Sequence, residues 1–338
     1  MARRERTTGL PRAKPSRRAH SAEPRILGIA WKDAYTRLAV LGAAGLLLLA
    51  IVAAFAYNIY EDRIGTPNKV VLRVGPEKYS LNYYADRLGQ YLQANSQSGS
   101  TVQLLEEDLL TKLEREAVGV VLAREKGISL GKDAVTQQIA STLGVPVGGT
   151  GSSFDTLYRN QLKTLKVSDS NFRKQNEAAL ANAKLIEMFK TEVGTKGTQY
   201  TLRAVLVSKK EDADAIFLRV KNGEDLGTIA QTESLDLESK QKDGLLTPEA
   251  PELIPEAVRK LLEGAKVKDL IGPVQVQQLW WISRIERIEE DDYSETQQQQ
   301  IAASRLDAAI TAKRAELASK IKQSLSGSDI KWAEKHLN

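Results

Sequence analysis

The sequence predicts an α+β protein with a single membrane-spanning helix near its N-terminus. Three observations indicate this fold class. Residues 38–60 form a run of 23 uncharged residues, and residues 80–192 repeat apolar side chains at the 3.6-residue period of helices. The segment from residue 203 opens with a strand, a charged turn and a helix, and a long helix ends the chain. At 338 residues, the chain is long enough for two or three domains.

Composition excludes several classes of active site. Cysteine is absent, and the only histidines are His20 and His336, one near each end of the chain. The region between them has no imidazole for a Ser-His-Asp triad or a HExxH zinc site, and thiolate metal sites are excluded. The sequence therefore predicts no cofactor and no metal ion.

The net charge of +5 is concentrated in one tail. Residues 1–37 hold ten Lys and Arg against Glu5, Glu23 and Asp33, a balance of +7, so the remaining residues sum to −2. A nearly neutral body does not favour a nucleic-acid groove, because such grooves neutralise phosphates with many basic side chains. A basic arm that binds nucleic acid is the alternative for the tail.

The uncharged run at residues 38–60 predicts a transmembrane helix in contact with the lipid bilayer. A spanning helix needs about 20 apolar residues, and this run suffices. The basic tail precedes it, so the positive-inside rule places residues 1–37 in the cytosol and the bulk of the chain outside the cell membrane. Aromatic residues suited to the two membrane interfaces are Trp31, Tyr35, Tyr57 and Tyr60.

A cleaved signal peptide is the alternative for this segment. Ala54-Phe55-Ala56 fits an A-x-A cleavage site. However, a signal peptide has a short basic region and an apolar core of about 7–15 residues. Here 37 residues precede a longer run, which favours an uncleaved anchor.

Residues 66–195 are predicted to form a helical domain that begins with a short strand, Lys69–Gly75. Ser80 can cap the first helix. Glycine-rich Gly144–Ser153 is predicted to be a loop, because no Lys-Ser/Thr follows these glycines as a phosphate-binding loop requires. The further helices are expected through Leu109 to Val121 with an end at Lys126-Gly127, from Lys132 onward, and at Phe154–Leu165 and Asp169–Glu192.

The last predicted element is a long amphipathic helix within residues 293–338. Ser294-Glu295-Thr296-Gln297 forms a capping box, and Ser326-Gly327 is expected to end the helix after roughly 30 residues, or about 45 Å. Lys313-Arg314 interrupts its apolar stripe. Either the rest of the chain or a second copy in a coiled-coil homodimer must cover this stripe. Its members are Ala303, Leu306, Ile310, Leu317 and Ile321.

Residues 199–288 resemble the parvulin (PpiC-type) prolyl isomerase family. "RAVLV" stands where the family has an Arg-His-Ile-Leu-Val-like strand, and "EDADAIFLRVKNGEDLGTIAQTESLD" follows the family's helix, glycine turn and second helix. "LIPEAVRKLLEGAKVKDLIGPVQVQQLWWISRIERI" matches its proline-led helix, Gly-Pro element and final strand. The resemblance implies a domain built on an antiparallel sheet.

Residues 66–195 resemble the N-terminal domain of the SurA/PrsA/trigger-factor-like chaperones. A strand-turn-helix opener is followed by "AREKGISL" and then by "FDTLYRNQLKTLKVSDSNFRK", in this order before the parvulin-like segment. The resemblance implies that residues 293–338 return to pack on the helical domain. The parvulin-like domain would then be an inserted lobe.

The parvulin resemblance also implies a degenerate catalytic site. The first-strand histidine of the family corresponds to Ala204 and the last-strand histidine to Trp281, while Asp236 is the one polar site residue that matches. The family's double-glycine segment is reduced to Asp243-Gly244-Leu245-Leu246. The methionine and phenylalanine that help to hold the substrate proline fall on Leu253 and Ala257.

Two adjacent tryptophans, Trp280 and Trp281, are expected to point to opposite faces of the last strand. In one interpretation, one ring is in the core and the other is merely exposed. In the other, the outward ring lines a shallow peptide-binding groove together with Leu226 and Leu253. The expected substrate-binding residues are therefore Leu226, Leu253, Trp280 and Trp281.

These features predict an extracytoplasmic, membrane-anchored folding factor that binds unfolded or newly translocated polypeptides. Apolar contact is non-directional and suits many clients. The alternatives are an active prolyl isomerase with an altered pocket, and a scaffold subunit that docks one fixed partner. Isomerases ease rotation across a barrier of ~18–20 kcal/mol without a covalent step, so the loss of both histidines does not by itself exclude activity.

Overall fold

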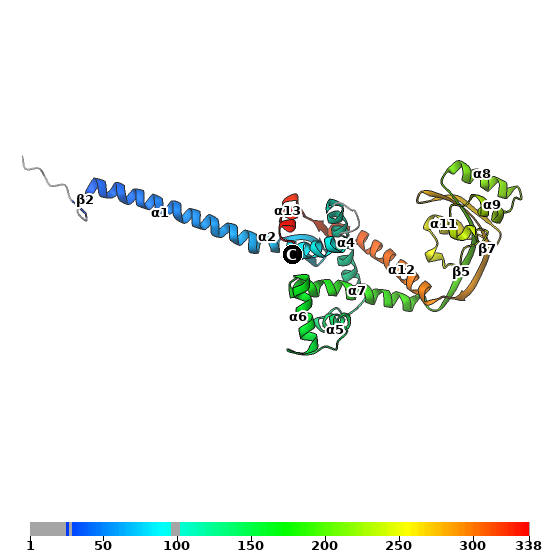
Figure 1. Cartoon of the computed structure of the whole chain (residues 1–338), viewed down its shortest axis with the longest axis horizontal. Coiled ribbons are helices and arrows are strands. Elements are labelled where there is room, and N and C mark those ends of the chain that lie inside the picture. The colour runs from blue at the N-terminus through cyan, green and yellow to red at the C-terminus, as the bar shows by residue number, and fades with distance from the viewer. Residues whose placement is uncertain (1–24, 27–28, 96–101, 338) are drawn as a thin grey trace, which may run out of the picture. The chain divides into compact units, whose positions relative to one another are not determined.

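The computed structural model describes residues 25–26, 29–95 and 102–337 (Figure 1). The chain divides into two compact units, Met1–Thr66 and Pro67–Asn338. Most of the basic tail predicted at residues 1–37, with His20, lies outside the described residues.

The first unit consists mainly of one long helix. α1 (Trp31–Tyr60) follows two paired two-residue strands, β1 (Arg25–Ile26) and β2 (Ile29–Ala30). A π-helical turn, η1 (Glu61–Gly65), and α2 (Thr66–Asn68) continue the helix. Leu38–Asn68 is long and apolar enough to cross a membrane, and its most apolar stretch is not buried within the structure. The helix therefore extends beyond the predicted residues 38–60 at both ends.

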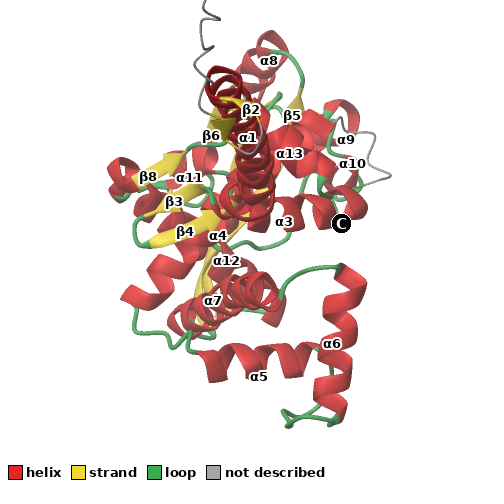
Figure 2. Cartoon of the chain, turned by 90° about the vertical axis from the view of Figure 1, so that its left-hand side faces the viewer, coloured by secondary structure: helices red, strands yellow, loops and turns green. Residues whose placement is uncertain are grey.

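The second unit contains a helical domain with a small antiparallel sheet. β3 (Val70–Val74) pairs with β4 (Glu77–Ser80) on one edge and with β8 (Ile321–Gln323) on the other (Figure 2). The strand predicted at Lys69–Gly75 is thus confirmed, while β4 and β8 were not predicted. β8 comes from the C-terminal end of the chain, so the sheet joins segments about 250 residues apart in sequence.

The predicted helices of this domain are confirmed, and serine hydroxyls cap three of them. Ser80, Ser152 and Ser168 each accept a hydrogen bond from the backbone N–H three residues later. The glycine-rich stretch before Ser152 is mainly loop, as expected. The helices are α3 (Leu81–Ala94), α4 (Val102–Glu125), α5 (Lys132–Thr142), α6 (Ser153–Leu165) and α7 (Asp169–Val193).

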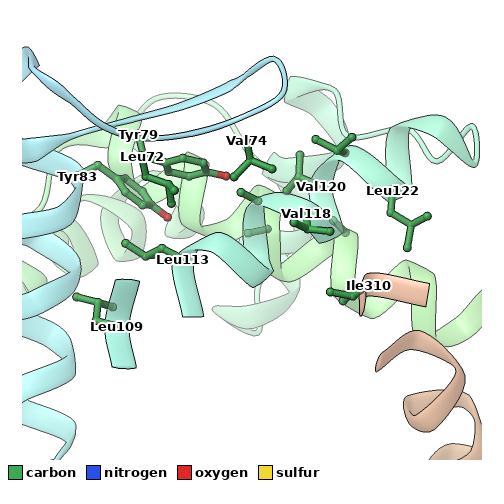
Figure 3. Close-up of a cluster of buried hydrophobic side chains, with 14 of the residues drawn as sticks. Leu72, Val74, Tyr79, Tyr83, Leu109, Leu113, Val118, Val120, Leu122 and Ile310 are labelled. Carbon is green, nitrogen blue, oxygen red and sulfur yellow. The ribbon is translucent and has the colours of Figure 1, made fainter. Parts of the chain in front are cut away.

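The core of the helical domain joins the small sheet to α3, α4, α7 and the C-terminal region. Figure 3 shows Tyr79 and Tyr83 above Leu113 of α4, with Ile310 of α12 (Glu295–Glu316) at the far end of the cluster. Ile310 approaches α4 at Gly119. A second, smaller core forms between α5, α6 and the start of α7, around Ile139, Phe154, Tyr158 and Phe172.

The predicted end of the C-terminal helix is wrong. α12 ends at Glu316, and the chain turns through η3 (Ala318–Lys320) to add β8 to the open edge of β3. Ser326 begins a helix instead of ending one, because it forms a capping box with Asp329 at the start of α13 (Gly327–Lys335). Ile321 therefore lies on a strand and not on the predicted stripe. The buried apolar residues of α12 are Ile301, Ala302, Leu306 and Ile310.

Lys313 and Arg314, which interrupt the apolar stripe of α12, form ion pairs with α4. Lys313 Nζ lies 2.5 Å from Glu125, and Arg314 Nε lies 2.5 Å from Glu114 Oε1. α12 also packs on α7. The apolar face of α12 is therefore covered by the chain itself.

The inserted domain, residues 196–292, is built on an antiparallel sheet in the order β5-β7-β6, as the resemblance implied. β7 pairs with β5 along the whole length of β5. The strands are β5 (Lys196–Val207), β6 (Leu270–Val276) and β7 (Leu279–Asp292). The helices are α8 (Lys210–Lys221), α9 (Leu226–Glu233), α10 (Leu237–Lys240), η2 (Pro251–Leu253) and α11 (Glu256–Leu262).

A small junction connects the inserted domain to α12. Ile301 of α12 is fully buried in a cluster with Val193 and Ala250. Arg305 Nη2 lies 2.8 Å from Glu252 Oε1 in η2, and the Ser304 hydroxyl donates to the Glu252 carbonyl over 3.3 Å. The α12 helix therefore packs on the helical domain with one part and on the inserted domain with another.

Candidate functional site

The register between β5 and β7 brings the two positions of the family histidines onto one face of the sheet. Ala204 lies opposite Ser283, and Leu206 lies opposite Trp281. Residues paired across an antiparallel sheet share a face, and so do residues two apart on a strand. Ala204 and Trp281 are therefore diagonal neighbours.

A cavity of about 360 Å³ lies on this face. Its polar lining consists of Thr247, Glu249 and Gln300, and Gln300 comes from α12. The inserted domain therefore does not form the cavity alone. The apolar and aromatic part of the lining is Tyr200, Leu202, Leu246, Leu253, Ile254, Pro255 and Trp281.

Glu249 reaches the cavity because its segment adds to the free edge of β5. Tyr200 and Glu249 exchange two backbone hydrogen bonds of 2.9 and 3.0 Å. At the start of the segment, Ala204 N–H donates to the Gly244 carbonyl over 2.8 Å. Gly244 has φ +75°, and a Cβ there would lie 2.6 Å from the Ala204 carbonyl oxygen, so glycine is required.

Two buried polar atoms of the cavity residues have no hydrogen-bond partner within the described part of the chain. They are Nε1 of Trp281, a donor, and Oε2 of Glu249. Burial raises the pKa of the Glu249 carboxyl above its usual value. The cavity thus combines an apolar lining with one unused donor and one carboxylate that lacks a cation.

The opposite face of the sheet is a packed core covered by α8 and α9. Leu226 is fully buried there with Val205 and Ile282, and Trp280 packs against the same cluster. Lys210 Nζ lies 5.6 Å from the centre of a Trp280 ring. The structure therefore brings Leu253 and Trp281 together at the cavity and leaves Leu226 and Trp280 on the other face.

The helix-covered face also holds a charged group of side chains around Glu286. Burial alone would raise the pKa of Glu286, but hydrogen bonds from Arg284, Lys268 and Arg203 outweigh it and hold the pKa below its usual value. The Glu286 Oε1 distances to Arg203 Nε and Arg284 Nε are 3.1 and 3.0 Å. These contacts are satisfied internally, so we assign them to the scaffold.

Asp236, the matching polar residue of the family site, caps a helix. Its Oδ2 accepts the Ser239 N–H over 3.4 Å at the start of α10, and it is not among the residues that line the cavity. Ala257 lies half-buried on α11. No group of three or more Asp, Glu or His in the described residues is arranged to hold a metal ion.

Sequence reasoning missed Tyr200, Glu249 and Gln300. The weak pairing of residues 244–249 with β5 has no signal in the sequence, because it consists of two isolated bridges. Gln300 is about 50 residues beyond Glu249 and meets the cavity only through the packing of α12. Leu253 and Trp281, which line the cavity, were predicted as substrate-binding residues because they occupy positions of the family pattern.

A family model described as "Rotamase: PPIC-type PPIASE domain" matches residues 200–287. These residues form a PpiC-type parvulin domain. The match covers both strands of the site face, so Ala204 and Trp281 lie within the parvulin domain. No curated protein matches the chain.

Several solved structures are similar to the chain over most of its length. A peptidylprolyl isomerase PrsA from Bacillus anthracis is 18% identical, with 64% of this chain and 100% of that one covered and a TM-score of 0.44. The foldase PrsA from Streptococcus pneumoniae is 13% identical, with 76% and 95% covered and a TM-score of 0.32. A SurA-like chaperone of Campylobacter jejuni is 14% identical, with 76% and 100% covered and a TM-score of 0.27.

Proposed function

We propose that this protein is a membrane-anchored, extracytoplasmic folding factor that binds unfolded polypeptides, with weak or absent prolyl isomerase activity. The main support is the cavity of the parvulin domain. It has a mostly apolar lining, and Trp281 stands in it where the family has a histidine. Such a cavity suits the capture of apolar side chains more than the hydrogen-bonded catalysis of the family.

The expected low activity follows from the residues at the positions of the family's catalytic site. Isomerisation requires stabilisation of a twisted imide, whose barrier is ~18–20 kcal/mol. Ala204 offers no side-chain donor, and Asp236 is engaged at the start of α10. At the position of the other family histidine, the donor Trp281 Nε1 sits on a large ring in place of a small imidazole.

The proposed membrane anchor is α1 with its continuation. Its apolar side chains are exposed over the whole uncharged run, which a lipid bilayer would cover. The basic residues precede the helix, and by the positive-inside rule this supports an orientation with the helical and parvulin domains outside the cytosol. Two of the similar structures are a foldase and a SurA-like chaperone, which agrees with this proposal.

An aggregation assay tests the proposal directly. The full chain in detergent is mixed with chemically unfolded citrate synthase, and light scattering is followed at several molar ratios. We expect the protein to suppress scattering and Trp281→Ala to weaken the suppression, whereas Trp280→Ala serves as a control on the opposite face. Scattering equal to that with detergent alone would contradict the proposal.

A further inference from the structure

A second, polar cavity of about 590 Å³ adjoins the cavity at Trp281. The two share Thr247, Glu249 and Gln300 in their linings. The second cavity extends to Asp291 and Asp292 at the end of β7. Together they form one groove with an apolar end at Trp281 and a polar end at these two aspartates.

The lining of this groove carries negative charge only. Its acidic residues are Glu249, Asp291 and Asp292, and neither cavity lining includes a lysine or arginine. Lys196 Nζ lies 3.3 Å from Asp292, but both side chains are largely exposed, so water screens this pair. Glu249 and Asp291 have no ion pair among the described residues. The groove is therefore complementary to a cation.

The unpaired atoms of the groove indicate the rest of the ligand. A buried donor or acceptor without a partner is costly, so a ligand that supplies the partner gains affinity. Trp281 Nε1 requires an acceptor, which every backbone carbonyl provides. Glu249 Oε2 requires a donor, which an ammonium or guanidinium group provides with charge assistance.

We infer that the groove selects extended polypeptide segments in which an apolar residue is next to a lysine or arginine. The apolar side chain enters the cavity at Trp281, the Trp281 N–H donates to a backbone carbonyl of the segment, and the basic side chain meets Glu249 and Asp291. Trp281 thus contributes affinity that does not depend on the sequence of the bound segment, and Glu249 contributes specificity for a basic side chain. This inference rests on the proposed binding of unfolded polypeptides.

Three labelled peptides test this selection with the full chain in detergent. Each is a fluorescein-labelled octapeptide with a Lys-Leu-Pro, Gln-Leu-Pro or Glu-Leu-Pro sequence in a Gly/Ser background, and anisotropy titrations at low salt measure Kd. We expect the lysine peptide to bind about tenfold more tightly than the glutamine peptide, as for a charge-assisted hydrogen bond. The glutamate peptide should bind most weakly.

Matched variants separate the two roles. Glu249→Gln should reduce the lysine preference to about threefold or less, since it keeps the shape but removes the charge. Trp281→Phe should weaken all three peptides by a similar factor of about three to ten, since it removes the N–H and keeps an aromatic ring. Trp280→Phe should change none of them. Equal binding of the three peptides, or an unchanged lysine preference in Glu249→Gln, would overturn the inference.

The aggregation assay and the peptide titrations together distinguish a failure of this inference from a failure of the proposed function. If the chain suppresses aggregation but binds the three peptides equally, the inference is wrong and the folding-factor proposal stands. If the lysine preference appears and depends on Glu249 while aggregation is not suppressed, the selective groove stands and the folding-factor proposal is wrong.

Discussion

Ala204 on β5 lies directly opposite Ser283 on β7, and both side chains are fully buried on the cavity-bearing face of the sheet. The Ser283 hydroxyl has no hydrogen-bond partner within the described residues. An imidazole at position 204 would gain a partner in Ser283 but would lack space. The large Trp281 ring lies diagonally across this pair and occupies part of the same face.

Replacement of both positions by histidine should therefore restore catalysis better than either change alone. Trp281→His frees volume, and Ala204→His then supplies the second imidazole. We expect Xaa-Pro isomerisation in the double variant about tenfold faster than in the unsubstituted protein, which corresponds to 1.36 kcal/mol in the barrier. A protease-free NMR exchange assay measures the rate.

The single Ala204→His variant is the control for this experiment. It overpacks a filled site and should cost about 1–3 kcal/mol of stability, visible as a lower melting temperature. If the unsubstituted protein already catalyses as fast as the double variant, the degenerate-site interpretation is wrong.

The junction between α12 and the parvulin domain should depend on Ile301. This side chain is fully buried against Val193 and Ala250, and truncation of a buried isoleucine costs about 2–5 kcal/mol. We expect Ile301→Ala to expose residues 248–254 to hydrogen exchange while α3 and α4 stay protected. Leu306 lies five residues further on the same helix but in the core of the helical domain. Leu306→Ala should therefore expose α3 and α4 to exchange and leave residues 248–254 protected. Identical exchange patterns for the two variants would contradict this division.

Glu249 should make the protein less stable as the pH rises. Because burial raises the pKa of this carboxyl in the folded state, the folded protein binds the proton more tightly than the unfolded chain, whose glutamate pKa is about 4.3. Stability is then lost as pH rises from the unfolded pKa through the folded one.

Urea unfolding of Glu249→Gln across the acidic range checks this sign. The variant should equal the unsubstituted protein near pH ~3 and exceed it at neutral pH, by less than about 1 kcal/mol because the site is partly open to water. Asp291→Asn, on the exposed side of the groove, is the matched control and should have a smaller effect. A variant less stable than the unsubstituted protein at neutral pH would show that the Glu249 charge is satisfied in the fold.

The charge asymmetry across α1 predicts the orientation in the membrane. A reporter that is active only outside the cytosol, fused after Asn338, should be active, because residues 1–37 carry a balance of +7. Reversal of the sign of four basic residues in this tail should reduce the signal. A fusion active only in the cytosol would contradict the orientation and the proposed place of action.

Local chemistry allowed much of the fold to be predicted. Helix starts at Ser80 and Ser294 follow from hydroxyls that bond the backbone within three residues. The parvulin pattern located the sheet domain because its turns and strands are close in sequence. The short strands β4 and β8 were missed, since each is stable only through its pairing with β3.

The candidate site was predicted less completely, for a related reason. Leu226 and Trp281 were both predicted to line the groove, but the register of the sheet and the packing of α9 bury Leu226 on the other face. Glu249 and Gln300 enter the cavity through contacts between distant segments. No local pattern encodes such contacts.

The pairing of β8 with β3 also fixes an order of assembly. Synthesis proceeds from the N-terminus, so the parvulin domain possesses all its strands once residue 292 has emerged. At that stage β3 is paired with β4 but still lacks β8, and α4 still lacks α12. Contacts between distant segments form late because the intervening loop must first be closed. The parvulin domain, encoded in the middle of the chain, can therefore fold first. The helical domain, whose segments lie on both sides of it in sequence, is completed last, by the final 45 residues.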